Sequence, residues 1–381
     1  MIVVSTVVVI VAILYAILVI SLALGWHRLP VFSCERNIAA PSKTFASIII
    51  AARNEERNIA TCLKELLEQD FLHADFEIIL VDDHSVDSTI SVVNEFVLKH
   101  SNIKLVSLAS ISQAIIGKKA AISFGIGQAR GELIITTDAD CRFPKDWLSC
   151  IVAYFEKHNP VMISAPVAFI PQRRIIGNFM ELEFMGLVTA GAGALGLRKP
   201  LMCNGANLAF RRNVFIERNA FEANSKLASG DDIFLMHSIR KKYGAQAIHF
   251  VKSAKAIVET PAPESLQEFL MQRIRWGSKT RAYPGSFTAA VALVVFLNSM
   301  LLLGGAIFLP FYSGLFYPVL TGWGLKIASD FLLLYQGCVF FDRRKLLNWF
   351  IPFQVVYVVY ITLVVFESLF SGYRWKGRRH R

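Results

Sequence analysis

Apolar residues are concentrated at the two ends of this chain, and a mixed pattern occupies its middle. Residues 2–24 carry no charge, and three further apolar stretches follow at 287–311, 315–341 and 349–370. Each stretch reaches the length of about 20 residues that a helix needs to cross a bilayer. We therefore expect an uncleaved transmembrane anchor at residues 1–26 and two to three transmembrane helices within 284–371, before a basic tail at 372–381.

Between these ends, short apolar runs alternate with segments of helical periodicity. The runs at 47–52, 76–81, 103–107 and 132–137 have the length and composition of buried strands, and helical spacing follows at 55–69, 85–99 and 118–129. Such alternation favours a mostly parallel sheet with helices on both faces. We expect an α/β domain over residues 45–283, ending in an amphipathic helix at 264–283 that lies on the membrane.

Polar clusters stand where the predicted strands end, which is where ligands bind in such sheets. Asp138 and Asp140 close the run at 132–137, and two carboxylates at this spacing can share Mg²⁺ or Mn²⁺. A turn or a helix cap is the alternative interpretation of the pair taken alone. Two further clusters, at 53–56 and 82–85, follow the first and second predicted strands.

The charge balance, 40 Lys and Arg against 29 Asp and Glu, predicts contact with anionic lipid rather than nucleic acid. Basic residues after the first span and before the second, including Arg36, Lys279 and Arg281, place the central domain in the cytoplasm, at the plasma (inner) membrane. Three C-terminal crossings would leave the basic tail outside. We therefore expect that one stretch does not cross, and choose 349–370, in which Pro352 stands near the start.

Lys326 and Asp330 are charged residues inside the apolar stretch 315–341, four positions apart on one helical face. An internal ion pair that holds the helices together is one interpretation. A polar lining for a substrate path is the other.

Six motifs, in this order, resemble the membrane-bound family 2 glycosyltransferases, which include cellulose, hyaluronan, chitin and poly-N-acetylglucosamine synthases. They are AARNEE at 51–56, VDDHS at 81–85, Gly117-Lys118, Asp138-Ala139-Asp140, Gly230-Asp231-Asp232 and QRIRW at 272–276. The last fits the QxxRW signature, and the fifth has Asp where a Glu-Asp pair is commoner. The resemblance covers about residues 45–281 and implies a GT-A-like nucleotide-sugar-binding domain.

The resemblance and the chemistry of nucleotide sugars together assign binding roles. Asp82 and Asp83 would accept hydrogen bonds from the base or ribose, although a charge at a helix N-terminus is the alternative. Lys118 would contact phosphate, and a solvated lysine beside Lys119 is the alternative. The residues expected to bind the nucleotide sugar are Ala52, Arg53, Glu55, Asp82, Asp83, Lys118, Asp138, Gln272, Arg273, Arg275 and Trp276.

Within the QxxRW motif, Gln272, Arg273 and Arg275 would meet diphosphate oxygens, and Trp276 offers a face on which a sugar ring can stack.

Catalytic roles follow in the same way. Asp138 and Asp140 would hold Mg²⁺ or Mn²⁺ against the diphosphate, with Asp140 the more direct ligand by resemblance. Asp232 is the candidate general base, with Asp231 the next candidate. The alternative for Asp232 is that it caps a helix at 233–242.

These observations predict a membrane-anchored, inverting, metal-dependent glycosyltransferase that transfers a hexosyl or N-acetylhexosaminyl group from a UDP-sugar. The expected acceptor is a growing polysaccharide, and a lipid or lipid-linked acceptor is the alternative. A non-catalytic nucleotide-binding subunit of a partner synthase is the alternative from another class. The presence of the metal-type pair together with a base-type Asp argues against that subunit.

Overall fold

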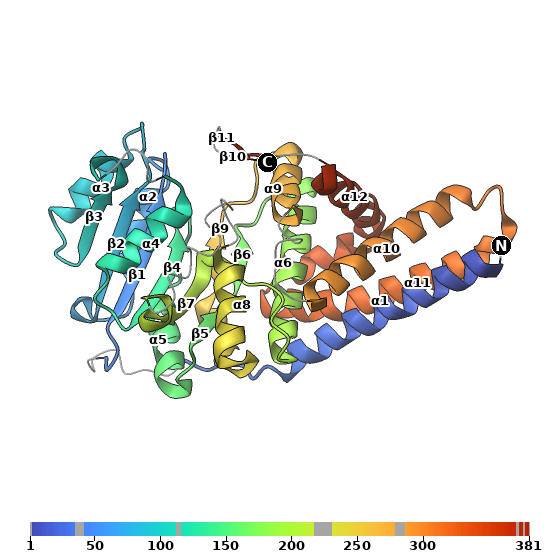
Figure 1. Cartoon of the computed structure of the whole chain (residues 1–381), viewed down its shortest axis with the longest axis horizontal. Coiled ribbons are helices and arrows are strands. Elements are labelled where there is room, and N and C mark those ends of the chain that lie inside the picture. Colours follow the sequence, from blue (N-terminus) through green and yellow to red (C-terminus); the bar gives the residue numbers. More distant parts are fainter. Residues whose placement is uncertain are drawn as a thin grey trace. The chain divides into compact units, whose positions relative to one another are not determined.

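The computed structural model of the chain describes residues 2–34, 42–111, 116–216, 231–278, 286–370, 373–375 and 378–380. It divides into two compact units, each described by itself (Figure 1). The helical unit consists of Met1–Arg28, Pro171–Leu201 and Ala262–Arg381, and the sheet unit of Leu29–Ile170 and Met202–Pro261. Each unit combines segments that are far apart in the sequence. The domain bounds expected from the sequence therefore stay a prediction.

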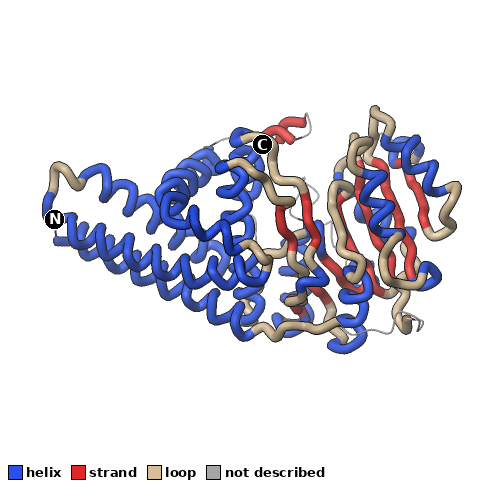
Figure 2. The backbone as a smooth tube through the Cα atoms, turned by 180° about the vertical axis from the view of Figure 1, so that it is seen from behind, coloured by secondary structure: helices blue, strands red, loops and turns tan. Residues whose placement is uncertain are grey.

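A seven-stranded sheet with the order β3-β2-β1-β4-β7-β5-β8 forms the centre of the sheet unit (Figure 2). Four of its six strand pairs are parallel, and β7 pairs antiparallel with both of its neighbours. The expected α/β fold with a mostly parallel sheet is therefore confirmed. Its strands are β1 Ala46–Ala52, β2 Phe76–Asp82, β3 Ile103–Ser107, β4 Leu133–Asp138, β5 Met162–Ser164, β7 Leu208–Arg211 and β8 Ile248–Phe250. A separate parallel pair joins β6 Val167–Phe169 to β9 Val258–Thr260.

The central strands are buried on both faces, which is why their sequences are continuous apolar runs rather than alternating ones. Helix α4 approaches them closely at Gly125, where a Cβ atom would lie 2.7 Å from Cγ2 of Ile49. The α-helices of this unit are α2 Ile59–Leu67, α3 Thr89–Val97, α4 Lys118–Gln128, α5 Trp147–His158, α7 Arg212–Ile216 and α8 Asp231–Tyr243. Its short 3-10 helices are η1 His73–Asp75, η2 Leu108–Ser110, η3 Gly205–Asn207, η5 Ala245–Ala247 and η6 Ala254–Ala256.

The helical unit gathers segments from three parts of the chain. Its helices are α1 Ile2–Arg28, α6 Ile175–Gly196, α9 Leu266–Gly277, α10 Ser286–Phe308, η8 Ser313–Leu315, α11 Phe316–Phe340, η9 Arg344–Trp349 and α12 Phe350–Phe370. A short antiparallel pair, β10 Tyr373–Trp375 and β11 Arg378–His380, follows α12. Helix α6 was not anticipated from the sequence.

Three segments of the described chain are long and apolar enough to cross a membrane: Ile2–Arg28, Phe287–Phe308 and Arg344–Ser368. They bear out one N-terminal and two C-terminal candidate spans. Helix α11 is not among them, because Lys326 and Asp330 lower its hydropathy. The ion-pair interpretation of these residues is confirmed: Lys326 Nζ lies 2.6 Å from Asp330 Oδ2, and Lys326 is fully buried.

Helix α12 runs across the helices of its unit rather than along them. Leu302 and Gly305 of α10 meet Gly322 and Val319 of α11, so the two helices are antiparallel. Extending this register places Phe296 of α10 at the height of Ala328 in α11. The start of α12 packs beside Phe331, with ring centroids 5.4 Å apart, and Phe366 near its end packs beside Phe296, 5.6 Å apart. Both ends of α12 therefore lie at a similar height along α11.

Helices α1 and α6 are in direct backbone contact at three glycines. A Cβ atom on Gly25 would lie 2.1 Å from the carbonyl oxygen of Gly193, and one on Gly193 would lie 2.1 Å from that of Leu22. Gly196 is equally close to the carbonyl of Gly25. Small residues at these positions allow the two helices to pack closely without a hydrophobic driving force.

We expect Gly193→Leu to lower the thermal unfolding midpoint of the detergent-purified protein, because the new side chain would overlap the backbone of α1. Overpacking of this kind costs about 1–3 kcal/mol or more. Gly324→Leu is the control, since no atom lies within 4 Å of a Cβ at that position. Equal midpoints for the two variants would contradict the α1–α6 contact.

Candidate active site

The carboxyl ends of β2, β1 and β4 lie side by side. In the parallel pairings, Ala52 of β1 is opposite Asp82 of β2, and Ala51 is opposite Asp138 of β4. Asp82 and Asp138 therefore stand on either side of the end of β1. The three polar clusters predicted from the sequence are brought to one edge of the sheet for this reason.

Asp83 connects three loops at this edge. Its carboxylate accepts a hydrogen bond of 2.9 Å from the backbone N–H of Gly117, lies 3.2 Å from Nδ1 of His84, and lies 4.0 Å from Nη1 of Arg53. Asp82 is fully buried and accepts from the backbone N–H of Ser85 at 3.3 Å. Both acidic residues thus have structural partners of their own, and Asp83 positions the loop that precedes α4.

The loops after β1 and β2 are joined by hydrogen bonds, and each contains a residue with left-handed backbone conformation, Asn54 with φ 54° and His84 with φ 60°. The N–H of Asn54 donates to Ser85 Oγ, and its side-chain oxygen accepts from the N–H of Val86, both at 2.9 Å. The N–H of Glu55 donates to Thr89 Oγ1 at 2.8 Å. Unusual backbone conformations persist where surrounding contacts hold them, and they cluster at functional sites.

Lys118 is surrounded by acidic groups. Its ammonium forms an ion pair with Oδ1 of Asp138, and each side chain remains about one-third exposed. Burial by itself lowers the pKa of Lys118, but the charges of Asp138, Asp232 and Asp140 outweigh burial and raise it above its ordinary value. One lysine therefore interacts with three of the carboxylates that the sequence singled out.

The negative charge at this edge exceeds what Lys118 neutralises. Burial, followed by the charges of Asp138 and Glu55, raises the pKa of Asp140 to about 6, although Lys118 acts in the opposite direction. Carboxylates that repel one another in this way are stabilised by a bound cation.

The residues present fit a hard divalent cation that is shared with a ligand. Within the described ranges, no group of three or more His, Cys, Asp or Glu side chains is arranged to hold a metal alone. Mg²⁺ is commonly held by one or two carboxylates plus substrate phosphates and water. Asp138 and Asp140 supply such a pair of carboxylates.

Asp232 belongs to the first turn of α8 and is fixed above β4. Its Oδ2 accepts from the N–H of Gly205 at 2.9 Å, and the carbonyl of Gly205 accepts from Thr136 Oγ1 of β4 at 2.9 Å. Its Oδ1 accepts from the N–H of Ile233 at 2.9 Å, as expected of a residue at a helix start. The side chain of Asp231 lies outside the described residues, as does Gly230.

Gly205 and Thr136 are functional-site residues that the motifs of the sequence do not indicate. The dipeptide Asn204-Gly205 is a turn signal that could have indicated the first of them.

The QxxRW residues lie on α9, in the helical unit, and are described there. The guanidinium of Arg273 is buried and paired with Glu183 of α6, and its Nη1 donates to Oε1 of Gln272. These partners differ from the diphosphate contact expected from the sequence, because a buried charge is held by the nearest opposite charge. Arg275 and Trp276 are half-buried. Lys279 and Arg281, on which the predicted orientation partly depends, lie outside the described residues, as does Arg36.

Comparison with known proteins defines the class. Residues 47–218 match the sequence model of glycosyl transferase family 2, and residues 133–366 match that of glycosyl transferase family group 2. Because the second match covers more than half of the chain, the protein belongs to glycosyl transferase family group 2.

Several curated proteins are similar to parts of the chain. A beta-monoglucosyldiacylglycerol synthase of Nostoc sp. (strain PCC 7120 / SAG 25.82 / UTEX 2576) is 30% identical over 169 residues, 43% of this chain and 34% of the relative. The poly(ribitol-phosphate) beta-N-acetylglucosaminyltransferase TarS of Staphylococcus aureus (strain Mu50 / ATCC 700699) is 31% identical over 113 residues, 30% of this chain and 19% of the relative. The probable glycosyltransferase YdaM of Bacillus subtilis (strain 168) is 28% identical over 238 residues, which are 60% of this chain and 54% of the relative. The chain thus spans only part of each relative.

Among solved structures, the mannosyltransferase PcManGT from Pyrobaculum calidifontis, in complex with GDP-Man and Mn²⁺, aligns with a TM-score of 0.57 at 16% sequence identity. The alignment covers 96% of this chain and 98% of that one. This likeness confirms the expected GT-A-like fold.

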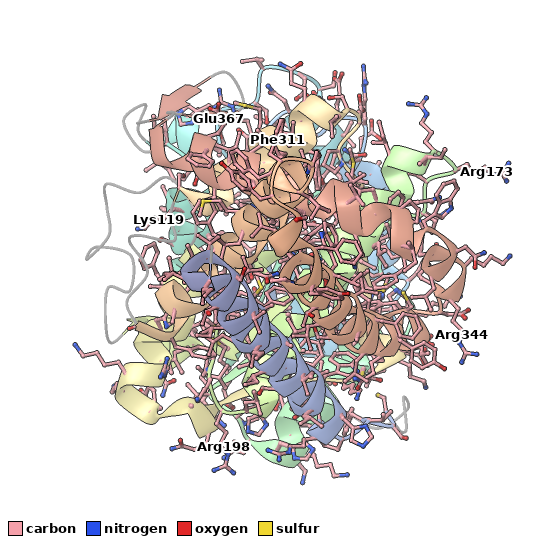
Figure 3. All side chains as sticks on the ribbon, turned by 90° about the vertical axis from the view of Figure 1, so that its right-hand side faces the viewer. Lys119, Arg173, Arg198, Phe311, Arg344 and Glu367 are labelled. Carbon is pink, nitrogen blue, oxygen red and sulfur yellow. The ribbon has the colours of Figure 1, made fainter. Side chains whose placement is uncertain are left out.

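We expect Lys118→Met to increase the affinity of the nucleotide-free protein for Mn²⁺ a few-fold, on the order of 1 kcal/mol for a partly exposed ion pair. The reason is that Lys118 competes with a metal ion for Asp138. Free Mn²⁺ measured by electron paramagnetic resonance gives the affinity. Lys119→Met is the control, because it removes the same charge one residue further on. The Lys119 side chain is labelled in Figure 3, and its replacement should leave the affinity for Mn²⁺ unchanged. An equal change in both variants would refute the competition.

Proposed function

We propose that this family 2 glycosyltransferase is anchored in a membrane and transfers a sugar from a UDP-sugar, with inversion, to a lipid or lipid-linked acceptor. The observation that carries the proposal is the cluster of Asp138, Asp140 and Asp232 around Lys118 at the carboxyl edge of the sheet. This cluster combines a cation-binding pair, a phosphate-type lysine and a further carboxylate in one place.

The proposed reaction is a single in-line displacement. Asp232 takes the proton of the acceptor hydroxyl, and the acceptor oxygen attacks the anomeric carbon as the bond to the diphosphate breaks. Lys118 leaves Asp138 to meet the departing diphosphate. A Mg²⁺ or Mn²⁺ ion bound by Asp138 and Asp140 would neutralise the charge that develops on the diphosphate. The need for one base and no covalent nucleophile supports inversion.

In the proposed binding mode, the nucleotide lies across the ends of β1 and β2. Asp82 and Asp83 contact the base or ribose, and Ala52, Arg53 and Glu55 line the loop beside them. The linked loops support this role, because preformed contacts reduce the cost of ordering them around a ligand. On α9, Gln272 and Arg275 would serve the diphosphate and Trp276 the acceptor, as the resemblance to QxxRW synthases implies.

Two observations favour a lipid acceptor over a polysaccharide acceptor. The Nostoc relative named above acts, by its name, on a diacylglycerol lipid, and it aligns over a longer segment of this chain than TarS does. Lys326 and Asp330 are also paired in the core of the helical unit, which favours a structural role over a polar passage. A growing polysaccharide remains the second candidate, since TarS by its name modifies a polymer.

We further propose that α1, α10 and α11 cross the membrane while α12 lies across them. The sheet unit, the loop at 342–345 and the basic tail then share the cytoplasmic side. This arrangement agrees with the positive-inside tendency, and the pairing of Lys326 with Asp330 lowers the cost of their burial in α11.

The acceptor is tested by offering the purified protein UDP- and GDP-sugars together with a membrane lipid extract or with oligosaccharides. Release of nucleoside diphosphate and the products are followed by mass spectrometry. A glycolipid product formed from a UDP-sugar supports the proposal. Extension of oligosaccharides alone supports the second candidate, and the absence of any transfer contradicts both.

We expect Asp140→Asn to reduce kcat/KM by about 100-fold or more, because half of the carboxylate pair that holds the cation is lost. Excess EDTA should do the same to the wild-type protein, and added Mn²⁺ should restore only the wild type. Asp146→Asn is the control, since that carboxylate is paired with Lys255 at 2.8 Å outside the cluster. Full activity in EDTA would refute the metal assignment.

We expect Asp232→Asn to bind UDP with wild-type affinity and to lose about 10²–10⁴-fold in kcat, because only the transfer of the acceptor proton is impaired. Asparagine has one acceptor oxygen and can retain only one of the hydrogen bonds from Gly205 and Ile233, so an unchanged thermal unfolding midpoint is needed to show that the local structure is retained. Isothermal titration with UDP and steady-state kinetics separate the two effects. Weaker UDP binding with an unchanged kcat would move Asp232 to the binding site and leave Asp231 as the candidate base.

A further inference from the structure

Arg273 occupies one of the two variable positions of the QxxRW motif, between Gln272 and Trp276. Its guanidinium contacts both of these motif residues: Nη1 donates to Oε1 of Gln272, and Cζ lies 4.3 Å from the centroid of the Trp276 ring. We propose that Arg273 is a positioning residue that holds the glutamine and the tryptophan of the motif in place for sugar transfer. This inference rests on the proposed function, in which α9 serves that reaction.

Two residues from other helices fix the guanidinium itself. Arg273 Nε donates to both carboxylate oxygens of Glu183 on α6 at 3.1 Å, and Nη2 donates to Oε2 as well. The hydroxyl group of Tyr360 on α12 donates a hydrogen bond to Glu183 Oε1 at 3.0 Å. The side chains of Arg273 and Glu183 are only 3% and 4% exposed. A buried charge pair with several hydrogen bonds allows one orientation of the arginine.

Aromatic rings complete the surroundings of Arg273. Besides Trp276, the ring of Phe269 lies 4.5 Å from the guanidinium carbon and that of Phe184 lies 5.8 Å from it. A planar guanidinium can stack on such faces while its edge makes hydrogen bonds, which the ammonium of lysine cannot do. The orientation of the Trp276 indole is therefore coupled to the Glu183–Arg273 pair.

The same contacts make the motif sensitive to α6 and α12. Glu183 and Tyr360 are 90 and 87 residues away from Arg273 in sequence, yet both determine where its guanidinium lies. Trp276 is proposed to contact the acceptor, so small displacements of its ring should impair transfer rather than nucleotide binding. The residues proposed to bind the base and ribose, Asp82 and Asp83, lie in the sheet unit and make none of the contacts described here.

Helix α6 provides a matched control. Glu181, two residues before Glu183, is also buried, and its Oε1 accepts from Arg343 Nε at 2.9 Å. Residues two apart on a helix point in different directions, since each residue turns the helix by about 100°. Arg343 Nη1 also donates to the carbonyl of Phe341 at 3.4 Å, and Arg343 has no proposed role in the reaction. Loss of this second pair should therefore weaken the helical unit without changing the motif.

The experiment compares Arg273→Lys with Arg343→Lys, both of which keep the charge and lose the forked geometry. For Arg273→Lys we expect a rise in the acceptor KM and a fall in kcat, together about 10- to 100-fold in kcat/KM. The affinity for UDP should also fall, because Gln272 is proposed to meet the diphosphate, whereas the affinity for uridine, which the sheet unit is proposed to bind, should stay within twofold of wild type. Arg343→Lys should keep wild-type kinetics at a temperature below its unfolding midpoint. Tyr360→Phe, which removes one hydrogen bond and keeps the ring, should show the same kinetic pattern as Arg273→Lys at smaller size.

Hydrogen exchange of the α9 amides, measured by mass spectrometry, gives a second readout that needs no activity. Exchange should be faster in Arg273→Lys and unchanged in Arg343→Lys. Wild-type kinetics in Arg273→Lys, or equal kinetic losses in the two arginine variants, would overturn the positioning role. If the wild-type protein transfers no sugar, the proposed function fails, while the exchange result still decides whether Arg273 holds α9 in place.

Discussion

The crowding of negative charge at the carboxyl edge of the sheet is the constraint on which the candidate site depends. Parallel register fixes Asp138 next to the end of β1, and the turn that follows brings Asp140 close to it. Asp232 belongs to α8 and is linked to β4 by Gly205, which forms hydrogen bonds with both Asp232 and Thr136. Lys118 interacts with all three carboxylates, and its single positive charge neutralises them only in part. Burial raises the pKa of Asp140 first of all, and the uncompensated charges of its neighbours raise it further.

A cluster of this kind needs a rigid surround, because carboxylates that repel one another would otherwise move apart. The loops after β1 and β2 provide it, because hydrogen bonds from Asn54 to Ser85 and from Val86 to Asn54 join one loop to the other. Asp83 adds a connection to Gly117, directly before Lys118. The start of α4, and with it the position of the lysine, is thus set by an acidic residue in the loop that follows β2.

The sequence predicted the strands and the clusters well, since both depend on local pattern. Continuous apolar runs gave β1, β2, β3 and β4 to within one residue at each end, and the rule that ligands bind beyond the ends of parallel strands brought Asp82 and Asp138 together. The partners of Arg273 could not be predicted in this way. Periodicity shows that α9 has a buried face, but it does not show which helix carries the opposite charge.

Two acidic residues in the otherwise apolar α6 were the available signal, and their meaning depended on packing. The antiparallel insertion of β7 between β4 and β5 was missed for the same reason, because the short run at 208–211 acquires its place only through long-range pairing.

The buried charges of the helical unit follow one pattern: Lys326 pairs with Asp330, Arg273 with Glu183, and Arg343 with Glu181. In apolar surroundings an unpaired charge is far more costly than a paired one, so each pair favours the arrangement of helices that brings its members together. Lys326 also donates to Gln354, while Asp330 accepts from Tyr15 at 2.7 Å. These contacts join α1, α11 and α12 at one height, and they hold α12 across the others. Since α12 carries Tyr360, the ion pair inside α11 and the ion pair beneath the QxxRW motif act on the same helix, and the placement of that motif depends on both.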